Sequence, residues 1–211
     1  VMGKPMLLIH PIPGQEERNA ALLLQEGVAQ RADDEATLLF RLQRLLADPA
    51  CGGVELSVPE LALALQAGQP LAALEAACQE QLEQHLRAGR TPVLYTSRGE
   101  EPCASSEARL ALGLAIAALM ARVAAALAER LGYLISKGGI TSHTLLADGL
   151  QLAGVQLQGQ VLPGLSLVLA GAGGMPVITF PGNLGEADTL WQAWRLLEGA
   201  EGPAEPEEER R

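Results

Sequence analysis

The sequence predicts an α/β fold, with a mainly parallel sheet covered by helices on both faces and a short antiparallel pair near residues 154–171. Short apolar runs alternate with longer segments whose apolar residues recur at helical spacing, and the connections between them are short. Hydrophobic residues make up 48% of the 211 residues, which excludes global disorder. Only two Phe, two Trp and two Tyr are present, so Leu, Ala and Val must build the core.

The first half of the chain reads as strands alternating with helices. The first apolar run is typical of a buried strand. Asp33 or Asp34 is a good N-cap for a helix, and Gly89 ends another helix. The predicted elements are strands at Met6–Ile9, Gly53–Val58 (stopping at Pro59) and Pro92–Ser97, and helices at Gln15–Gln30, Asp34–Ala47 and Leu71–Ala88.

The second half opens with a long Ala- and Leu-rich helix, for which Ser105 or Ser106 is the expected N-cap. Apolar and polar residues then alternate over residues 154–171, which predicts an antiparallel pair that turns near Pro163-Gly164. The other predicted elements are helices at Ser105–Arg130, Thr141–Ala153 and Leu190–Leu197 and strands at Gly132–Ser136 and Pro176–Phe180.

Charge and composition exclude several classes of function. The chain has 15 Lys and Arg against 25 Asp and Glu, a net charge of −10, which argues against a general nucleic-acid binder. The apolar run Leu110–Ala121 is shorter than the roughly 20 residues that span a bilayer, so we expect a buried helix and no membrane association. No apolar signal region opens the chain. We expect one α/β domain at 1–197 and an acidic, disordered tail at 198–211.

The cysteines predict a cytoplasmic protein with reduced thiols rather than a metal centre. Cys51, Cys78 and Cys103 are odd in number, none belongs to a CxxC pair, and no His lies at metal-ligand spacing from them. Reduced thiols are typical of the cytoplasm. We therefore predict no metal site, and the sequence identifies no catalytic base.

The first loop that could carry chemistry joins an apolar strand to a helix. In parallel sheets, ligands bind beyond the carboxyl ends of the strands, where such loops lie. Two adjacent glycines let the backbone approach a ligand, and the helix start offers N–H groups to a phosphate. A tight capped turn that binds nothing has the same pattern. The candidate residues are Ser136, Lys137 as a point charge, Gly138, Gly139, and Thr141 and Ser142 as helix caps or hydroxyl donors.

Two further glycine loops follow. Pro163 and Gly164 form a turn signal where the sequence pattern changes. Gly182, Asn183 and Gly185 lie between an apolar strand and a helix, where exposed amides and the Asn side chain could contact a base, a ribose or a phosphate. Asn is also a good helix cap, so a purely structural role is the alternative.

Taken in order, these three loops resemble those of the nucleotide-binding C-terminal domain of the four-carbon acid sugar kinase family, over roughly residues 4–197. That family carries a Gly-Gly-acidic-Thr loop, a Pro-Gly turn and a Gly-Asn-Phe-Gly loop in this order. The resemblance implies an α/β domain that holds ATP, with Mg²⁺ on the nucleotide. It also implies a separate domain that binds the sugar acid, with phosphoryl transfer in the cleft between the two.

The sequence departs from the family pattern at several positions. Ile140 replaces an acidic residue, Leu184 replaces a Phe, and Phe180-Pro181 stands where the family has Lys-Ser. Lys137 replaces a small or apolar residue and would partly restore the lost charge. The segment His10–Gly14 stands where a Gly-Ser loop is expected, and the chain begins where the substrate domain would end.

Three hypotheses follow. The chain is an ATP-binding domain that phosphorylates a sugar acid only with a partner domain or chain. Alternatively, it is a catalytically silent relative that binds another phosphorylated metabolite or serves as an interaction or regulatory module. A third alternative is an α/β scaffold without a ligand. Self-association is compatible with each of them, because an Ala- and Leu-rich domain without its partner exposes apolar surface.

Overall fold

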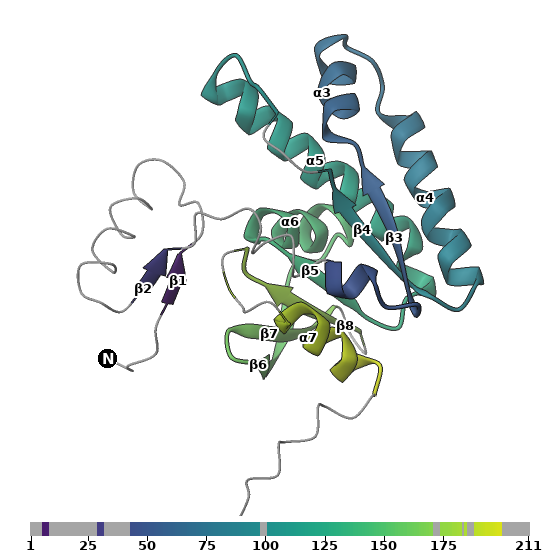
Figure 1. The fold of residues 1–211 in the computed structure, drawn as a ribbon, viewed down its shortest axis with the longest axis vertical. Helices are drawn as coiled ribbons and strands as arrows, with labels where there is room; N and C mark the ends of the chain where they lie inside the picture. Colours follow the sequence, from purple (N-terminus) through teal and green to yellow (C-terminus); the bar gives the residue numbers. More distant parts are fainter. Residues whose placement is uncertain are drawn as a thin grey trace, which may run out of the picture.

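A computed structural model describes residues 6–8, 29–31, 43–97, 101–170, 174–182, 184 and 188–199. The fold is mixed α/β with three small sheets, and the labelled helices lie around the β3-β4 and β5-β8-β7-β6 sheets (Figure 1). The strands are β1 (Met6–Leu8), β2 (Ala29–Arg31), β3 (Cys51–Leu56), β4 (Thr91–Thr96), β5 (Leu134–Lys137), β6 (Val155–Leu162), β7 (Leu165–Ala170) and β8 (Met175–Phe180), and the helices are α3 (Val58–Gln66), α4 (Ala72–Arg87), α5 (Ser106–Leu127), α6 (Gly139–Thr144) and α7 (Thr189–Leu197).

The described strands do not form the single, mainly parallel sheet that the alternation predicts. Two sheets are two-stranded and parallel, β1-β2 and β3-β4, and the third is mixed, with the order β5-β8-β7-β6. In the mixed sheet β5 pairs with β8 in parallel, whereas β6, β7 and β8 pair antiparallel. The predicted antiparallel pair is confirmed, and its hairpin is what makes this sheet mixed. Its turn is Pro163-Gly164, where Gly164 has a φ of 80°.

Two clusters of apolar side chains form most of the core. Leu56 of β3, Leu61 of α3 and Leu119 and Val123 of α5 are fully buried in the first cluster, which α4 also joins. The second cluster lies between the mixed sheet and α7. Aliphatic residues build the first cluster, as the scarcity of aromatic residues predicts. The fully buried residues of the second cluster are Leu165, Ile178, Phe180 and Ala193.

The long helix α5 is capped as predicted, because the Ser105 hydroxyl accepts a hydrogen bond of 3.2 Å from the Ala108 N–H. By length and apolarity alone, residues 106–130 could also cross a membrane. Leu119 and Val123, however, are fully buried in the first apolar cluster, which is typical of a core helix. The last turn, Ala128–Arg130, narrows to a 3-10 helix.

Two predicted elements differ in the structure. The predicted strand Gly53–Val58 ends at Leu56, and Pro59 lies in the first turn of α3, a helix that the sequence prediction missed. Proline is tolerated there because the first N–H groups of a helix have no partner within it. The prediction of a helix that ends at Gln30 is wrong at that end, because Gln30 pairs with Leu7 in the β1-β2 sheet. Ala29, also in that predicted helix, begins β2. The remaining residues of the two predicted N-terminal helices lie outside the described residues, except 43–47, of which 43–46 are helical.

Candidate functional site

The first and third glycine loops lie side by side because the strands that precede them, β5 and β8, are parallel neighbours. The Gly138 N–H donates a hydrogen bond of 2.8 Å to the Phe180 carbonyl at the end of β8. Gly138 has a φ of 104°, a conformation that other residues rarely adopt. A Cβ placed on Gly182 would lie 3.8 Å from the Gly138 Cα. The two loops are therefore in contact through their backbones.

The second loop packs against the third. Gly164 lies so close to the Leu184 side chain that a Cβ at Gly164 would collide with it. The Gly164 N–H also donates a hydrogen bond of 3.2 Å to the Gln160 side-chain oxygen. The structure thus brings the described parts of all three loops together, while Asn183 and Gly185 lie outside the described residues.

Lys137 links the first loop to the third. Its ammonium group donates hydrogen bonds to the carbonyl oxygens of Pro181, at 3.2 Å, and Gly182, at 2.9 Å. The same group lies 4.1 Å from the centre of the Phe180 ring, a favourable cation–π distance. A positive charge therefore lies where the two loops meet.

The serines of the first loop hold the strand to the helix. The Ser142 hydroxyl lies 3.1 Å from the Ser136 carbonyl oxygen and 3.0 Å from the Ser136 hydroxyl, and both side chains are buried. The prediction that Thr141 or Ser142 caps the helix is wrong. Because Gly138 turns the chain directly, the helix begins two residues earlier, with Gly138 itself as N-cap. It continues as a π-helical turn at Leu145–Gly149, short of the predicted end at Ala153.

The beginning of α6 is open to solvent. Gly139 is exposed, and a Cβ placed on it would meet no atom within 4 Å. Ile140, at the position where the resemblance implies an acidic residue, is 56% exposed, and His143 is exposed one turn later. Backbone N–H groups in the first turn of a helix favour anions, and Lys137 adds charge beside them. This arrangement is suited to a phosphate.

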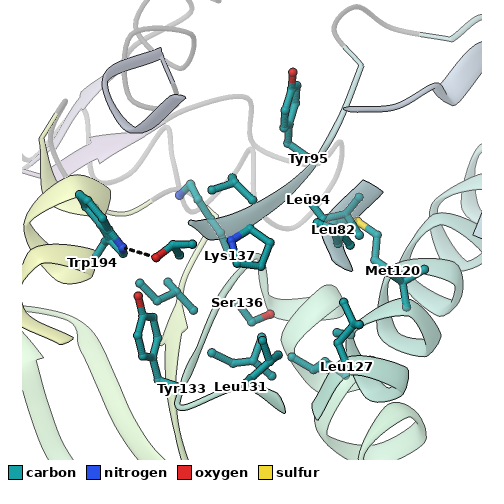
Figure 2. Close-up of a pocket in the computed structure, with 18 of the residues that line it drawn as sticks. Leu82, Leu94, Tyr95, Met120, Leu127, Leu131, Tyr133, Ser136, Lys137 and Trp194 are labelled. Carbon is teal, nitrogen blue, oxygen red and sulfur yellow. Dashed lines mark hydrogen bonds between the residues drawn. The ribbon is translucent and has the colours of Figure 1, made fainter. Parts of the chain in front are cut away.

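A cavity of about 770 Å³ lies next to this loop (Figure 2). Ser136, Lys137 and Thr141 line one part of it. The rest of the lining is mainly apolar and comes chiefly from α4, α5, β4, β5 and α7, including Leu82, Leu94, Met120 and Leu127.

A polar cluster that sequence reasoning missed also borders this cavity. The Tyr133 hydroxyl and the Thr91 hydroxyl both donate hydrogen bonds to one oxygen of Glu198, the latter at 3.1 Å. The Trp194 indole N–H donates to Thr91 at 3.3 Å (Figure 2). Burial, followed by the hydrogen bond to Glu198, raises the pKa of Tyr133 well above its ordinary value. Glu198 was assigned to the acidic tail because no local sequence signal shows a partner 65 residues away.

Within the described ranges, no group of three His, Cys, Asp or Glu side chains is arranged to hold a metal ion. The buried thiol of Cys51 is not activated, because burial and, to a smaller extent, Asp48 and Glu198 raise its pKa to about 11. The chemistry that the described site offers is therefore anion binding through backbone amides and Lys137.

Comparisons with known proteins cover the part of the chain that contains these loops. The family model for the nucleotide-binding C-terminal domain matches residues 41–190. A domain of unknown function (DUF1537) from Bordetella bronchiseptica, a domain-swapped dimer with bound citrate, is 20% identical with a TM-score of 0.52, over 95% of this chain and 42% of that chain. A Haemophilus influenzae protein of the DUF1537 family is 16% identical with a TM-score of 0.57, over 94% of this chain and 40% of that chain.

These identities show a shared fold and no more. The chain spans about two fifths of the length of the solved structures that it resembles. No curated protein matches it.

Proposed function

This chain belongs to the nucleotide-binding C-terminal domain family, and we propose that it binds ATP, with Mg²⁺ on the phosphates, at the loop between β5 and α6. The observation that carries the proposal is the closeness of Gly138 and Gly182, since a Cβ on Gly182 would lie 3.8 Å from the Gly138 Cα. The two glycines belong to loops that the family resemblance assigns to the nucleotide. Both glycines fall within the matched residues 41–190.

Charge supports a phosphate at this place. The chain is strongly acidic overall, so an anionic ligand needs local positive charge. The resemblance implies a Lys at the position of Phe180, and here the ammonium group of Lys137 lies 4.1 Å from the Phe180 ring. The cation that the departure at Phe180 removes is thus replaced from the neighbouring strand.

The glycines leave room for the ligand. Gly139 is exposed with open space above it, so phosphate oxygens can approach the first turn of α6. Gly182 lies opposite, and the contact between Gly164 and Leu184 fixes the segment that follows it. We assign the phosphates to the first loop, through Lys137, Gly138, Gly139 and Thr141, and the remainder of the nucleotide to the third loop, with Asn183 and Gly185 included on the resemblance alone.

The reaction that we propose is phosphorylation of a sugar acid, with a partner domain or chain holding the acceptor. Phosphoryl transfer requires charge neutralisation by Mg²⁺ and a group that takes the acceptor proton. Lys137 and the α6 amides would hold the phosphates, and we name no base in this chain.

We place the protein in the cytoplasm on the strength of its reduced cysteines. Self-association is part of the proposal, since the similar Bordetella protein is a domain-swapped dimer.

Ile140 favours a second candidate function. An apolar side chain that is 56% exposed stands where a carboxylate could orient a metal ion or a ribose. A site without that carboxylate suits a catalytically silent relative that binds another phosphorylated metabolite.

Titration calorimetry on the whole chain separates these candidates. We expect ATP and ADP to bind with Mg²⁺, and adenosine to bind more weakly because it lacks the phosphates. Binding of a sugar phosphate with no binding of ATP or ADP would favour the second candidate. No heat with any of them at millimolar concentration would contradict both.

A further inference from the structure

The cavity of about 770 Å³ follows the edges of two strands. Every residue of β4 and every residue of β5 lines it. Because successive side chains of a strand point to opposite faces of a sheet, a cavity that meets all of them lies along the strand edge rather than over one face. Among the described strands, β4 pairs only with β3, and β5 pairs only with β8. The cavity therefore interrupts the sheet layer between β4 and β5.

Backbone donors of both strands point toward this gap. The Thr91 N–H donates to Ala50, just before β3, and the Ser97 N–H donates to Leu56 of β3, each at 2.8 Å, so the N–H groups of the residues between them alternate in direction. The alternation turns the N–H groups of Leu94 and Thr96 away from β3 and toward the cavity.

The same argument applies to β5. Gly138 donates toward β8, at 2.8 Å from the Phe180 oxygen, which turns the Ile135 N–H to the cavity side. A backbone N–H left without a partner in an apolar place is destabilising, so these donors favour an occupant with carbonyl oxygens along its length.

The walls of the gap are apolar on both faces of the sheet layer. Leu82 of α4 and Met120 and Leu127 of α5 lie on one side, and Leu190 and Trp194 of α7 also line the cavity (Figure 2). Apolar walls with hydrogen-bonding edges are the surroundings of a central strand in a sheet covered by helices. We propose that this gap is an acceptor slot for one further strand and that β1 of this same chain fills it.

The composition and pairing of β1 support this assignment. Its sequence, Met6-Leu7-Leu8, has no polar residue, as expected for a strand buried on both faces. Its only strand partner among the described residues is the three-residue β2, and an isolated two-stranded ribbon is marginal in water. Figure 1 shows this pair to one side of the other sheets.

Insertion of β1 unites two sheets into one, with the order β3-β4-β1-β5-β8-β7-β6. In this order β3 and β4 lie on one side of β1, and β5 and β8 lie on its other side. The direction in which successive strands are added therefore reverses at β1. Ligands of open α/β sheets bind where the strand order reverses in this way. The inserted strand would therefore support the loop at Lys137 and Gly138 from the side opposite β8. The inference does not rest on the proposed nucleotide, because the slot is defined by strand edges alone.

Amide hydrogen exchange on the full chain tests the slot. Leu7 and Gln30 are register partners at the centre of the β1-β2 pair, so Leu7→Pro and Gln30→Pro each place a proline at the middle of one of its two strands. We expect the amides of Leu94, Thr96 and Ile135 to be protected in the unsubstituted chain. Leu7→Pro should speed their exchange at least tenfold while Val93 and Tyr95, which face β3, stay protected, and Gln30→Pro should leave all five unchanged.

Three outcomes would overturn the inference. They are rapid exchange at these amides in the unsubstituted chain, equal effects of the two proline variants, and protection that appears only with Mg²⁺-ATP, which would assign the cavity to the nucleotide.

Cross-linking tests the inference in the case in which Leu7→Pro fails to fold. In the double variant Leu7→Cys and Leu94→Cys, a short thiol-reactive cross-linker should join the two new cysteines within one chain. In the double variant Gln30→Cys and Leu94→Cys it should not. A cross-link found only between two chains would contradict insertion within the same chain.

Discussion

The ammonium group of Lys137 lies over the Phe180 ring, 4.1 Å from its centre, and donates hydrogen bonds to the two carbonyl groups that follow Phe180. One side chain therefore ties the end of β5 to the segment after β8. The position of Gly182 relative to Gly138, which shapes the candidate phosphate site, depends on this link.

Lys137→Met should weaken both the fold and the site. The loss of the cation–π contact and of two hydrogen bonds should lower the free energy of unfolding by about 1–2 kcal/mol, measured by urea denaturation. The affinity for ATP should fall about tenfold, because a charge beside the phosphates is lost. Lys137→Arg keeps the charge and should retain most of the affinity. An ATP affinity that is the same in Lys137→Met as in the parent would contradict the assigned role.

Gly164→Ala should destabilise the chain by more than Gly159→Ala does. Both glycines have positive φ, at 80° and 141°, so each substitution introduces backbone strain. Only at Gly164 would the new Cβ also collide with Leu184, whereas Gly159 has open space around it. We expect a loss of about 2–3 kcal/mol at Gly164 and about 1 kcal/mol at Gly159 in thermal or urea unfolding. Equal losses would mean that the collision with Leu184 adds nothing to the destabilisation caused by Gly164→Ala.

Stability should fall at alkaline pH because of Cys51. The pKa of its thiol is raised from 9.0 to about 11, mainly by burial. The unfolded chain therefore loses this proton at a lower pH than the folded chain does. The contribution is fully present below pH 9 and is lost as the pH rises from 9 to 11, by up to about 1.4 kcal/mol per pH unit. Urea denaturation of Cys51→Ala should show a shallower decline over that range, and an identical decline would exclude Cys51 as the cause.

Tyr133→Phe should loosen the C-terminal end of the domain. The substitution removes the hydroxyl that donates to Glu198 and leaves the ring in place. We expect about 1 kcal/mol of destabilisation and faster amide exchange at the end of α7, with nucleotide affinity unchanged. A large loss of nucleotide affinity would instead place this polar cluster in the binding site.

The parts of the fold and site that the sequence predicts are those with local signals. Alternation at 154–171 and the Pro-Gly dipeptide are sufficient to predict the β6-β7 hairpin, and Ser105 is sufficient to predict the start of α5. The order of the three glycine loops predicts the family, which the match over residues 41–190 confirms.

The remaining features depend on contacts between distant segments. No local pattern pairs Tyr133 with Glu198 or brings Gly164 against Leu184, because packing and strand order create these contacts. The start of α3 was missed for a different reason. A proline after an apolar run predicts the end of a strand, but proline is equally tolerated in the first turn of a helix, and Ser57 caps a helix here.

Thermal melting of Gly139→Val with and without Mg²⁺-ATP tests the central claim most directly. A Cβ at Gly139 or at Gly132 meets no atom within 4 Å, so Gly132→Val is a matched control and neither variant should alter the fold. At about 100 times its Kd, a ligand adds roughly 2.7 kcal/mol to stability. We predict that ATP raises the melting temperature of the parent and of Gly132→Val but not that of Gly139→Val. An equal rise in all three would contradict nucleotide binding at this loop, and no rise in the parent would contradict nucleotide binding altogether.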